Sequence, residues 1–176
     1  PKGGASAVKR TIILAGKGVT YDTGGADLKV EGAMAGMSRD KGGAAAVAGL
    51  LRAIATRDGE DERLPGVHVV GLLGLGRNSI GEEAFVSDEI VRARSGVRVR
   101  IGNTDAEGRL LLADLLAAAR EIAAEAADPS RVVILSVATL TGHVYRAHGP
   151  YVGAIGNARA RVTLDALDAL VERWGE

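Results

Sequence analysis

Several residue types are absent or scarce in this sequence, and each absence removes a class of function. There is no cysteine among the 176 residues, which excludes disulfides, zinc sites built on thiolates and cysteine nucleophiles. The 22 basic and 22 acidic side chains leave a formal net charge of zero, so nothing electrostatic favours nucleic acid or an anionic membrane as a partner. No apolar run approaches the roughly 20 residues of a membrane span. An initiator methionine is also absent, and we therefore expect a fragment or a processed product.

Aromatic residues make up only 3% of the chain, whereas glycine contributes 25 residues. The core must therefore be built mainly from alanine, valine and leucine. Short apolar runs predict buried strands, and segments rich in alanine and leucine with apolar residues on one face predict helices. We expect strands at 11–15, 67–75, 97–101, 131–137 and 152–155, and helices at 42–57, 110–126 and 163–174, the last with Thr163 as its N-cap.

The alternation of strands and helices predicts one α/β domain, with a mostly parallel mixed sheet flanked by helices. Segment 97–101 alternates polar and apolar residues, so this strand is expected to be antiparallel or at an edge. In parallel sheets, functional sites form in loops beyond the carboxyl ends of the strands. Polar loops follow Ala15, Ile101 and Val137, and all three would lie at that edge.

The glycine-rich segment 16–29 directly follows the first predicted strand and carries two lysines and two aspartates. A phosphate-binding loop is one interpretation, but that motif needs Gly-Lys followed by Ser or Thr at the start of a helix, and here Lys17 is followed by Gly18. A solvated loop with incidental charges is the other interpretation of these residues taken alone.

Two further polar segments hold carboxylates near predicted helix starts. Asp40 precedes the helix at 42–57, where a carboxylate is stabilised by the helix dipole without any other function. In segment 103–110, Asp105, Glu107 and Arg109 occupy alternate positions and could point to one place in an extended loop. An acidic helix start with a surface salt bridge is the alternative for this segment.

Taken together, these loops suggest a metal site. Four carboxylates, Asp22, Asp40, Asp105 and Glu107, would repel one another if they met at one edge of the sheet. Two divalent cations would balance their four negative charges, and hard oxygen ligands suit Mn²⁺, Mg²⁺ or Zn²⁺. Positive charge from Lys29 and Arg109 would then favour an anionic transition state.

Four sequence blocks resemble the leucyl aminopeptidase family of dinuclear metallopeptidases. They occur in the family's order with compatible spacing, and the resemblance runs from about Thr11 to at least Gly142. It is particularly similar to a eukaryotic branch of aminopeptidase-like proteins. The resemblance implies that residues 1–176 are part of an incomplete catalytic domain, without the N-terminal domain and the C-terminal segment. The blocks are GKGVTYDTGGADLK (16–29), RDKGGAA (39–45), NTDAEGRLLLAD (103–114) and ATLTG (138–142).

The resemblance also implies a role for individual side chains. Lys29 and Arg109 match the family's two catalytic side chains that are positively charged and do not bind metal. In the family, the arginine holds a bicarbonate ion that acts as general base. Asp22 and Glu107 match carboxylates shared by both metal ions. The complete set of matched metal ligands is Lys17, Asp22, Asp40, Asp105 and Glu107. The matched substrate-binding positions are Met37, Asn103, Thr139, Leu140 and Gly142.

The activity implied is release of N-terminal amino acids from peptides by attack of a hydroxide that bridges two divalent ions, Zn²⁺ or Mn²⁺ with Mg²⁺ as a further option. The resemblance implies a cytoplasmic enzyme that forms a homohexamer when full-length, with no nucleic-acid or membrane partner. A catalytically inactive aminopeptidase-like scaffold or binding protein is the alternative. Lys41 departs from the family pattern and would add a cation beside Asp40 unless it points away.

Overall fold

The computed structural model describes residues 8–56, 64 and 66–174. The chain divides into two units, Pro1–Leu140 and Thr141–Glu176, which are described separately. The first unit holds the sheets and two long helices, and the second consists of helices and irregular segments.

Three parallel strands form the main sheet of the first unit: β1 (Arg10–Asp22), β2 (Val67–Asn78) and β5 (Val132–Val137), in the order β2-β1-β5. The central strand β1 supplies the centre of the core with Ile13, Leu14 and Ala15, all buried. The parallel sheet confirms the predicted α/β class. Strand β1 is longer than predicted, because segment 16–22 continues it instead of forming a loop.

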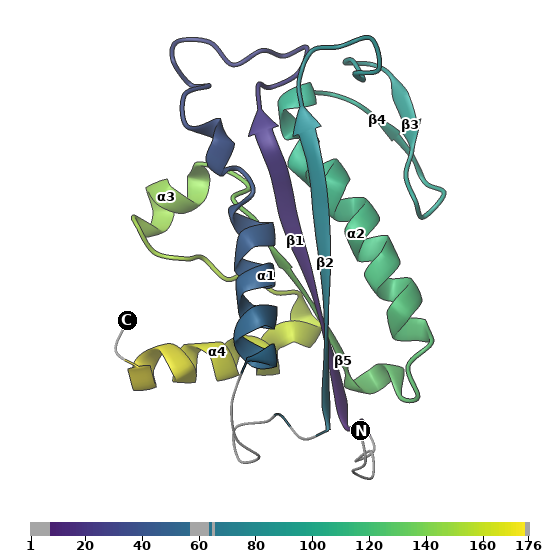
Figure 1. The fold of residues 1–176 in the computed structure, drawn as a ribbon, viewed down its shortest axis with the longest axis vertical. Coiled ribbons are helices and arrows are strands. Elements are labelled where there is room, and N and C mark those ends of the chain that lie inside the picture. Colours follow the sequence, from purple (N-terminus) through teal and green to yellow (C-terminus); the bar gives the residue numbers. More distant parts are fainter. Residues whose placement is uncertain (1–7, 57–63, 65, 175–176) are drawn as a thin grey trace. The chain divides into compact units, whose positions relative to one another are not determined.

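Helices α1 (Gly42–Ala55) and α2 (Glu107–Ala124) cover opposite faces of this sheet (Figure 1). Alternation along β1 explains the arrangement, because Gly16 faces Ala44 of α1 while Lys17 faces Gly108 of α2. The start of α1 packs tightly on the end of β5: a methyl group added at Gly43 would lie 2.0 Å from the carbonyl oxygen of Val137. Only glycine fits there.

A separate antiparallel pair, β3 (Ile90–Arg92) and β4 (Arg98–Arg100), forms a small second sheet. Its second strand confirms the antiparallel strand predicted from alternation at 97–101, while β3 was not predicted. Short 3-10 helices connect the larger elements: η1 (Met37–Arg39), η2 (Thr104–Ala106) and η3 (Pro129–Arg131).

The second unit contains α3 (His143–His148), η4 (Ala158–Ala160) and α4 (Arg161–Trp174). The helix predicted at 163–174 is confirmed, but Thr163 is not its N-cap, since α4 begins at Arg161. Asn157 caps the preceding η4 turn instead. The strand predicted at 152–155 is wrong: Val152 and Ile155 are 95% and 96% exposed, and this segment is irregular. Glycine and alanine fill the middle of this segment, and both are depleted in strands.

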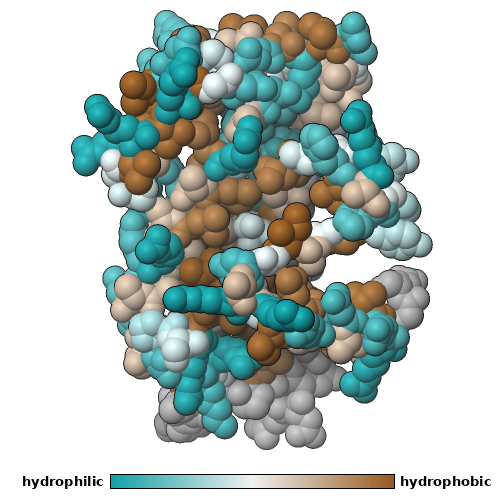
Figure 2. Space-filling view, turned by 180° about the vertical axis from the view of Figure 1, so that it is seen from behind, coloured by the Kyte–Doolittle hydropathy of each residue, from teal (hydrophilic) through white to brown (hydrophobic). Residues whose placement is uncertain are grey.

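Large hydrophobic side chains reach the surface in both units, and Figure 2 shows hydrophobic residues gathered in the middle of one face. On β2, for example, Leu75 is 66% exposed. Contiguous exposed apolar surface of this kind marks contact sites. No helix in the described part of the chain combines the length and apolar character that a membrane crossing requires.

Candidate metal centre

A bulge near the end of β1 brings polar side chains onto one face. Val19 pairs with Gly76 and Asp22 pairs with Asn78, so β1 contains one residue more than β2 over this interval. In a regular strand, Lys17 and Asp22 would point to opposite faces, because they are an odd number of residues apart. The extra residue reverses the alternation. Both buried side chains therefore reach the side where α2 begins.

Lys17 is the centre of a buried cluster that joins three segments. Its ammonium group donates to both carboxylate oxygens of Asp40, at 2.8 and 2.7 Å, and lies 3.0 Å from Oε1 of Glu107. Asp40 lies just before α1, and Glu107 is the first residue of α2. Thr139 closes the cluster, because its hydroxyl donates to Asp40 at 2.8 Å. Side chains from β1 and from both helix starts thus meet at one point.

Lys29 forms a second cluster beside the first. Its ammonium group lies 3.1 Å from Oδ2 of Asp22 and 2.5 Å from Oδ1 of Asp105. Burial pulls the pKa of Lys29 down, but the attraction of Asp105 and Asp22 outweighs burial and raises that pKa above its ordinary value. Lys29 is therefore a cation at neutral pH.

Carboxylate oxygens of Asp22, Asp105 and Glu107 lie within 4.8 Å of one another, close enough to share a metal ion. Burial pushes the pKa of Asp22 up, but hydrogen bonds from the Gly24 amide, the Asn78 side chain and Lys29 outweigh it and lower that pKa. For Glu107, burial dominates and raises the pKa despite the nearby Lys17. Close carboxylates from different segments are thus held together by hydrogen-bond donors and by the two lysines.

The structure thus brings together Lys17, Lys29 and the four predicted carboxylates. Arg109 takes no part in these ion pairs, since it lies exposed in the first turn of α2. Lys41 points away from the cluster, because its ammonium group donates to the carbonyl of Thr20 on β1. The cation beside Asp40 is therefore Lys17 and not Lys41.

Of the five predicted substrate-binding residues, Thr139 contacts the cluster directly. Asn103 is exposed and caps η2, with its side-chain oxygen accepting from the amide of Asp105 at 2.7 Å. Met37 is half-buried in η1, and Leu140 is 42% exposed. Gly142 belongs to the second unit, where it precedes α3.

Three positions at the site were given no role by sequence reasoning: Asn78, Asp27 and Thr104. Thr104 is fully buried, and its hydroxyl donates to the carbonyl of Gly24 at 2.6 Å. Asp27 accepts from the Thr104 amide at 2.6 Å, so the loop after β1 is tied to the turn that carries Asp105. The sequence signals for Asn78 were its place shortly after the buried run 67–75 and its match to the first residue of an Asn-Met-Pro-Ser-Gly loop in many family members.

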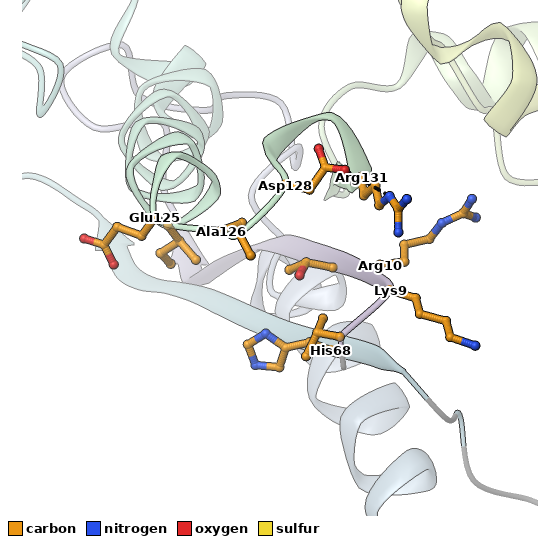
Figure 3. A pocket seen from close by; sticks show the side chains of 11 residues that line it. Lys9, Arg10, His68, Glu125, Ala126, Asp128 and Arg131 are labelled. Atoms are coloured by element: carbon orange, nitrogen blue, oxygen red, sulfur yellow. Dashed lines mark ion pairs between the residues drawn. The ribbon is translucent and has the colours of Figure 1, made fainter. Parts of the chain in front are cut away.

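A cavity of about 340 Å³ lies at the opposite edge of the sheet, where β1 and β2 begin and α2 ends (Figure 3). Its charged side chains do not converge: Lys9 and Arg10 extend away from His68 and Glu125 in Figure 3. Arg131, also on its wall, is paired with Asp128 at 3.0 Å. The converging polar groups of the first unit therefore lie at the carboxyl edge, where parallel sheets usually bind ligands.

Comparison with known proteins identifies relatives of this chain. The family model described as the cytosol aminopeptidase family, catalytic domain, matches residues 2–176. A Caenorhabditis elegans protein named as an aminopeptidase is 42% identical over 160 residues, which make up 91% of this chain and 29% of that protein. The chain thus spans less than a third of that relative's length.

Two solved structures share the fold. The bottromycin maturation enzyme BotP in complex with Mn is 36% identical with a TM-score of 0.78, over 97% of this chain and 35% of that chain. The leucyl aminopeptidase from Trypanosoma brucei in complex with bestatin is 37% identical with a TM-score of 0.69, over 85% of this chain and 26% of that chain.

Proposed function

The chain belongs to the cytosol aminopeptidase family, and from this we propose that it carries the metal centre of an aminopeptidase that releases N-terminal residues from peptides. The observation that carries the proposal is the meeting of four carboxylates and two lysines from separate segments at the carboxyl edge of the sheet. A purely structural role would not need so many like charges in one place, because burying charged groups is costly.

The side chains at the site fit a pair of divalent cations. Oδ1 of Asp105 is buried, and the group beside it among the described residues is the Lys29 ammonium. Four carboxylates against two ammonium groups leave an excess of negative charge at the site. We propose that Lys17, Asp22, Asp40, Asp105 and Glu107 hold two ions, either Zn²⁺ or Mn²⁺ with Mg²⁺ as a third option; the Mn in the BotP structure supports manganese.

When bound, the two cations supply Lewis acidity that activates water and polarises the scissile carbonyl. An ammonium group has no lone pair, so Lys17 must release its proton before it can act as a ligand. Lys29 stays protonated beside Asp22 and Asp105, and its charge stabilises the oxyanion that develops on the substrate carbonyl. Arg109, which is exposed, would hold a bicarbonate, and that group would supply a general base.

Substrate contacts and assembly belong to the same proposal. Met37, Asn103, Thr139, Leu140 and Gly142 would contact the peptide substrate. The full-length protein would form a homohexamer, as the resemblance to the leucyl aminopeptidase family implies, and the family's name supports a cytoplasmic location. We also propose that these 176 residues form part of a larger catalytic domain, and the exposed Leu75 on edge strand β2 supports this.

The test is hydrolysis of a leucine anilide by the full-length protein, with and without Mn²⁺, compared with the N-acetylated form of the same substrate. We expect metal-dependent release of leucine and the free aniline from the free-amine substrate alone. Lys41→Met serves as a matched lysine control for Lys29→Met, because Lys41 points away from the site. Two bound metal ions without turnover would instead favour the inactive scaffold. Cleavage of the acetylated substrate would contradict an aminopeptidase.

A further inference from the structure

Asn78 is the last residue of β2, and its side-chain amide is directed at both carboxylates assigned to bridge the metals. Its nitrogen lies 2.8 Å from Oδ1 of Asp22 and 3.3 Å from Oε2 of Glu107, and it also donates to the carbonyl of Thr104 at 3.1 Å. All three partners are acceptors, so the NH₂ group must face them. The residue is only 6% exposed, which shields these contacts from water.

The amide engages one oxygen of each carboxylate and leaves the other to a cation. Asp22 directs Oδ1 to Asn78 and Oδ2 to Lys29. Glu107 directs Oε2 to Asn78 and Oε1 to Lys17. Asn78 is therefore a neutral donor that contacts both carboxylates, while the Gly24 amide also donates to Oδ1 of Asp22 at 2.9 Å. A lysine or arginine at this position would add a positive charge that competes with a metal ion, whereas an amide adds none.

The backbone makes Asn78 a rigid support. Its carbonyl accepts from both the amide and the hydroxyl of Thr23, at 2.9 and 3.0 Å. It also pairs with Asp22 in the register of β1 and β2, immediately after the bulge. The end of β2 is thus fastened to the loop that follows β1, and this fixes the backbone position from which the amide reaches the carboxylates.

We propose that Asn78 is a positioning residue that sets the spacing and orientation of Asp22 and Glu107, so that both can bridge one pair of metal ions. The inference rests on the proposed function, since without a metal pair there is nothing for Asn78 to position. Groups that orient metal ligands affect metal affinity about 10–100-fold when removed. Asn78 touches neither metal nor substrate in this assignment and acts only through the two carboxylates.

The test uses the full-length protein loaded with Mn²⁺, with Asn78→Ala and Asn78→Asp as variants and Ser79→Ala as the neighbouring control. Asn78→Asp keeps the shape of the side chain but replaces the donor with a charged acceptor. Two Mn²⁺ ions about 3.5–4 Å apart are magnetically coupled, so their electron paramagnetic resonance spectrum differs from that of isolated ions. Titration calorimetry gives the affinity of each ion, and circular dichroism of the metal-free proteins checks that each variant is folded.

We expect both Asn78 variants to bind the second Mn²⁺ about 10–100-fold more weakly and to lose the coupled signal, while Ser79→Ala matches the wild type. If Asn78→Ala does not fold, the shape-conserving Asn78→Asp carries the comparison. A coupled pair with wild-type affinity in a folded Asn78 variant overturns the inference and leaves the proposed function standing. A wild-type protein that binds no coupled pair overturns both.

Discussion

Replacing Gly108 with alanine tests how closely α2 must approach Lys17. Gly108 is the second residue of α2, and a methyl group there would lie 2.6 Å from Cε and 2.9 Å from Nζ of Lys17. Carbon atoms prefer separations of about 3.5–4.0 Å, so the Lys17 amine must move by about 1 Å. Its shortest contact with Asp40 is 2.7 Å. A shift of this size takes the amine beyond about 3.2 Å, where N–H···O hydrogen bonds end.

Two effects of opposite sign decide the stability of this variant. Alanine is favoured over glycine inside a helix by about 0.5–1 kcal/mol, whereas loss of a charge-assisted hydrogen bond costs about 1.5–3 kcal/mol. The metal-free protein should therefore lose about 0.5–2.5 kcal/mol of unfolding free energy. Metal binding should suffer more, because a displaced amine cannot reach an ion held by Asp40 and Glu107.

The assay is calorimetric titration of the full-length Gly108→Ala protein with Mn²⁺, paired with urea unfolding of the metal-free form. We expect one tightly bound ion per chain, where the wild type binds two. Gly102→Ala is the matched control, because a methyl group at Gly102 meets no atom within 4 Å. Two ions bound by Gly108→Ala with wild-type affinity would refute the placement of Lys17 as a ligand.

Three further changes probe the same site. Lys17→Met leaves buried Asp40 and Glu107 without their cation, and should lower the unfolding free energy of the metal-free protein by about 3–5 kcal/mol in urea titrations; a loss below about 1 kcal/mol would speak against a buried ion pair. Lys29→Met should reduce kcat about 10²–10³-fold with metal content unchanged, and unaltered turnover would remove its catalytic role. Hydrogen bonds from the Thr104 amide and from Ser87 lower the pKa of Asp27 below its ordinary value of 3.8. The ionised Asp27 therefore stabilises the folded protein above pH 3.8, and this stabilisation is lost as the pH falls through the lowered pKa of the folded state. Asp27→Asn should therefore flatten the dependence of unfolding free energy on pH around and below the ordinary pKa of 3.8, and equal slopes in both proteins would contradict this.

The fold class and the meeting of the acidic loops could be predicted from sequence, because both follow from general rules. Alternating strands and helices predict a parallel sheet, and a parallel sheet gathers the loops after its strands at one edge. The segments carrying Asp22, Asp40 and Asp105 do meet there. The individual ligand roles came from family resemblance instead, since spacing along the chain carries no information on distance in space.

Features that depend on tertiary contacts escaped prediction. Segment 16–22 looks like a loop because glycine and lysine are poor strand formers, yet flanking strands and helices bury it. The bulge before Asp22 leaves no mark in the sequence, although it decides which way that side chain points. An asparagine at the end of a strand is typical of a turn, so the donor role of Asn78 was hidden. The run 152–155 has strand-like residues, yet the segment is irregular.

The contact between Gly43 and the end of β5 affects how variants of this protein should be interpreted. Any side chain at position 43 would collide with the Val137 carbonyl and push the first turn of α1 outward. Asp40 lies three residues earlier, so it would be carried away from Lys17 by the same movement. A mutational screen for lost activity would therefore score Gly43 alongside the ligands, although it contributes no functional atom. Sensitivity to substitution at position 43 reflects the lack of space between α1 and β5. Catalytic or metal-binding roles therefore have to be assigned from side-chain contacts and not from mutational sensitivity alone.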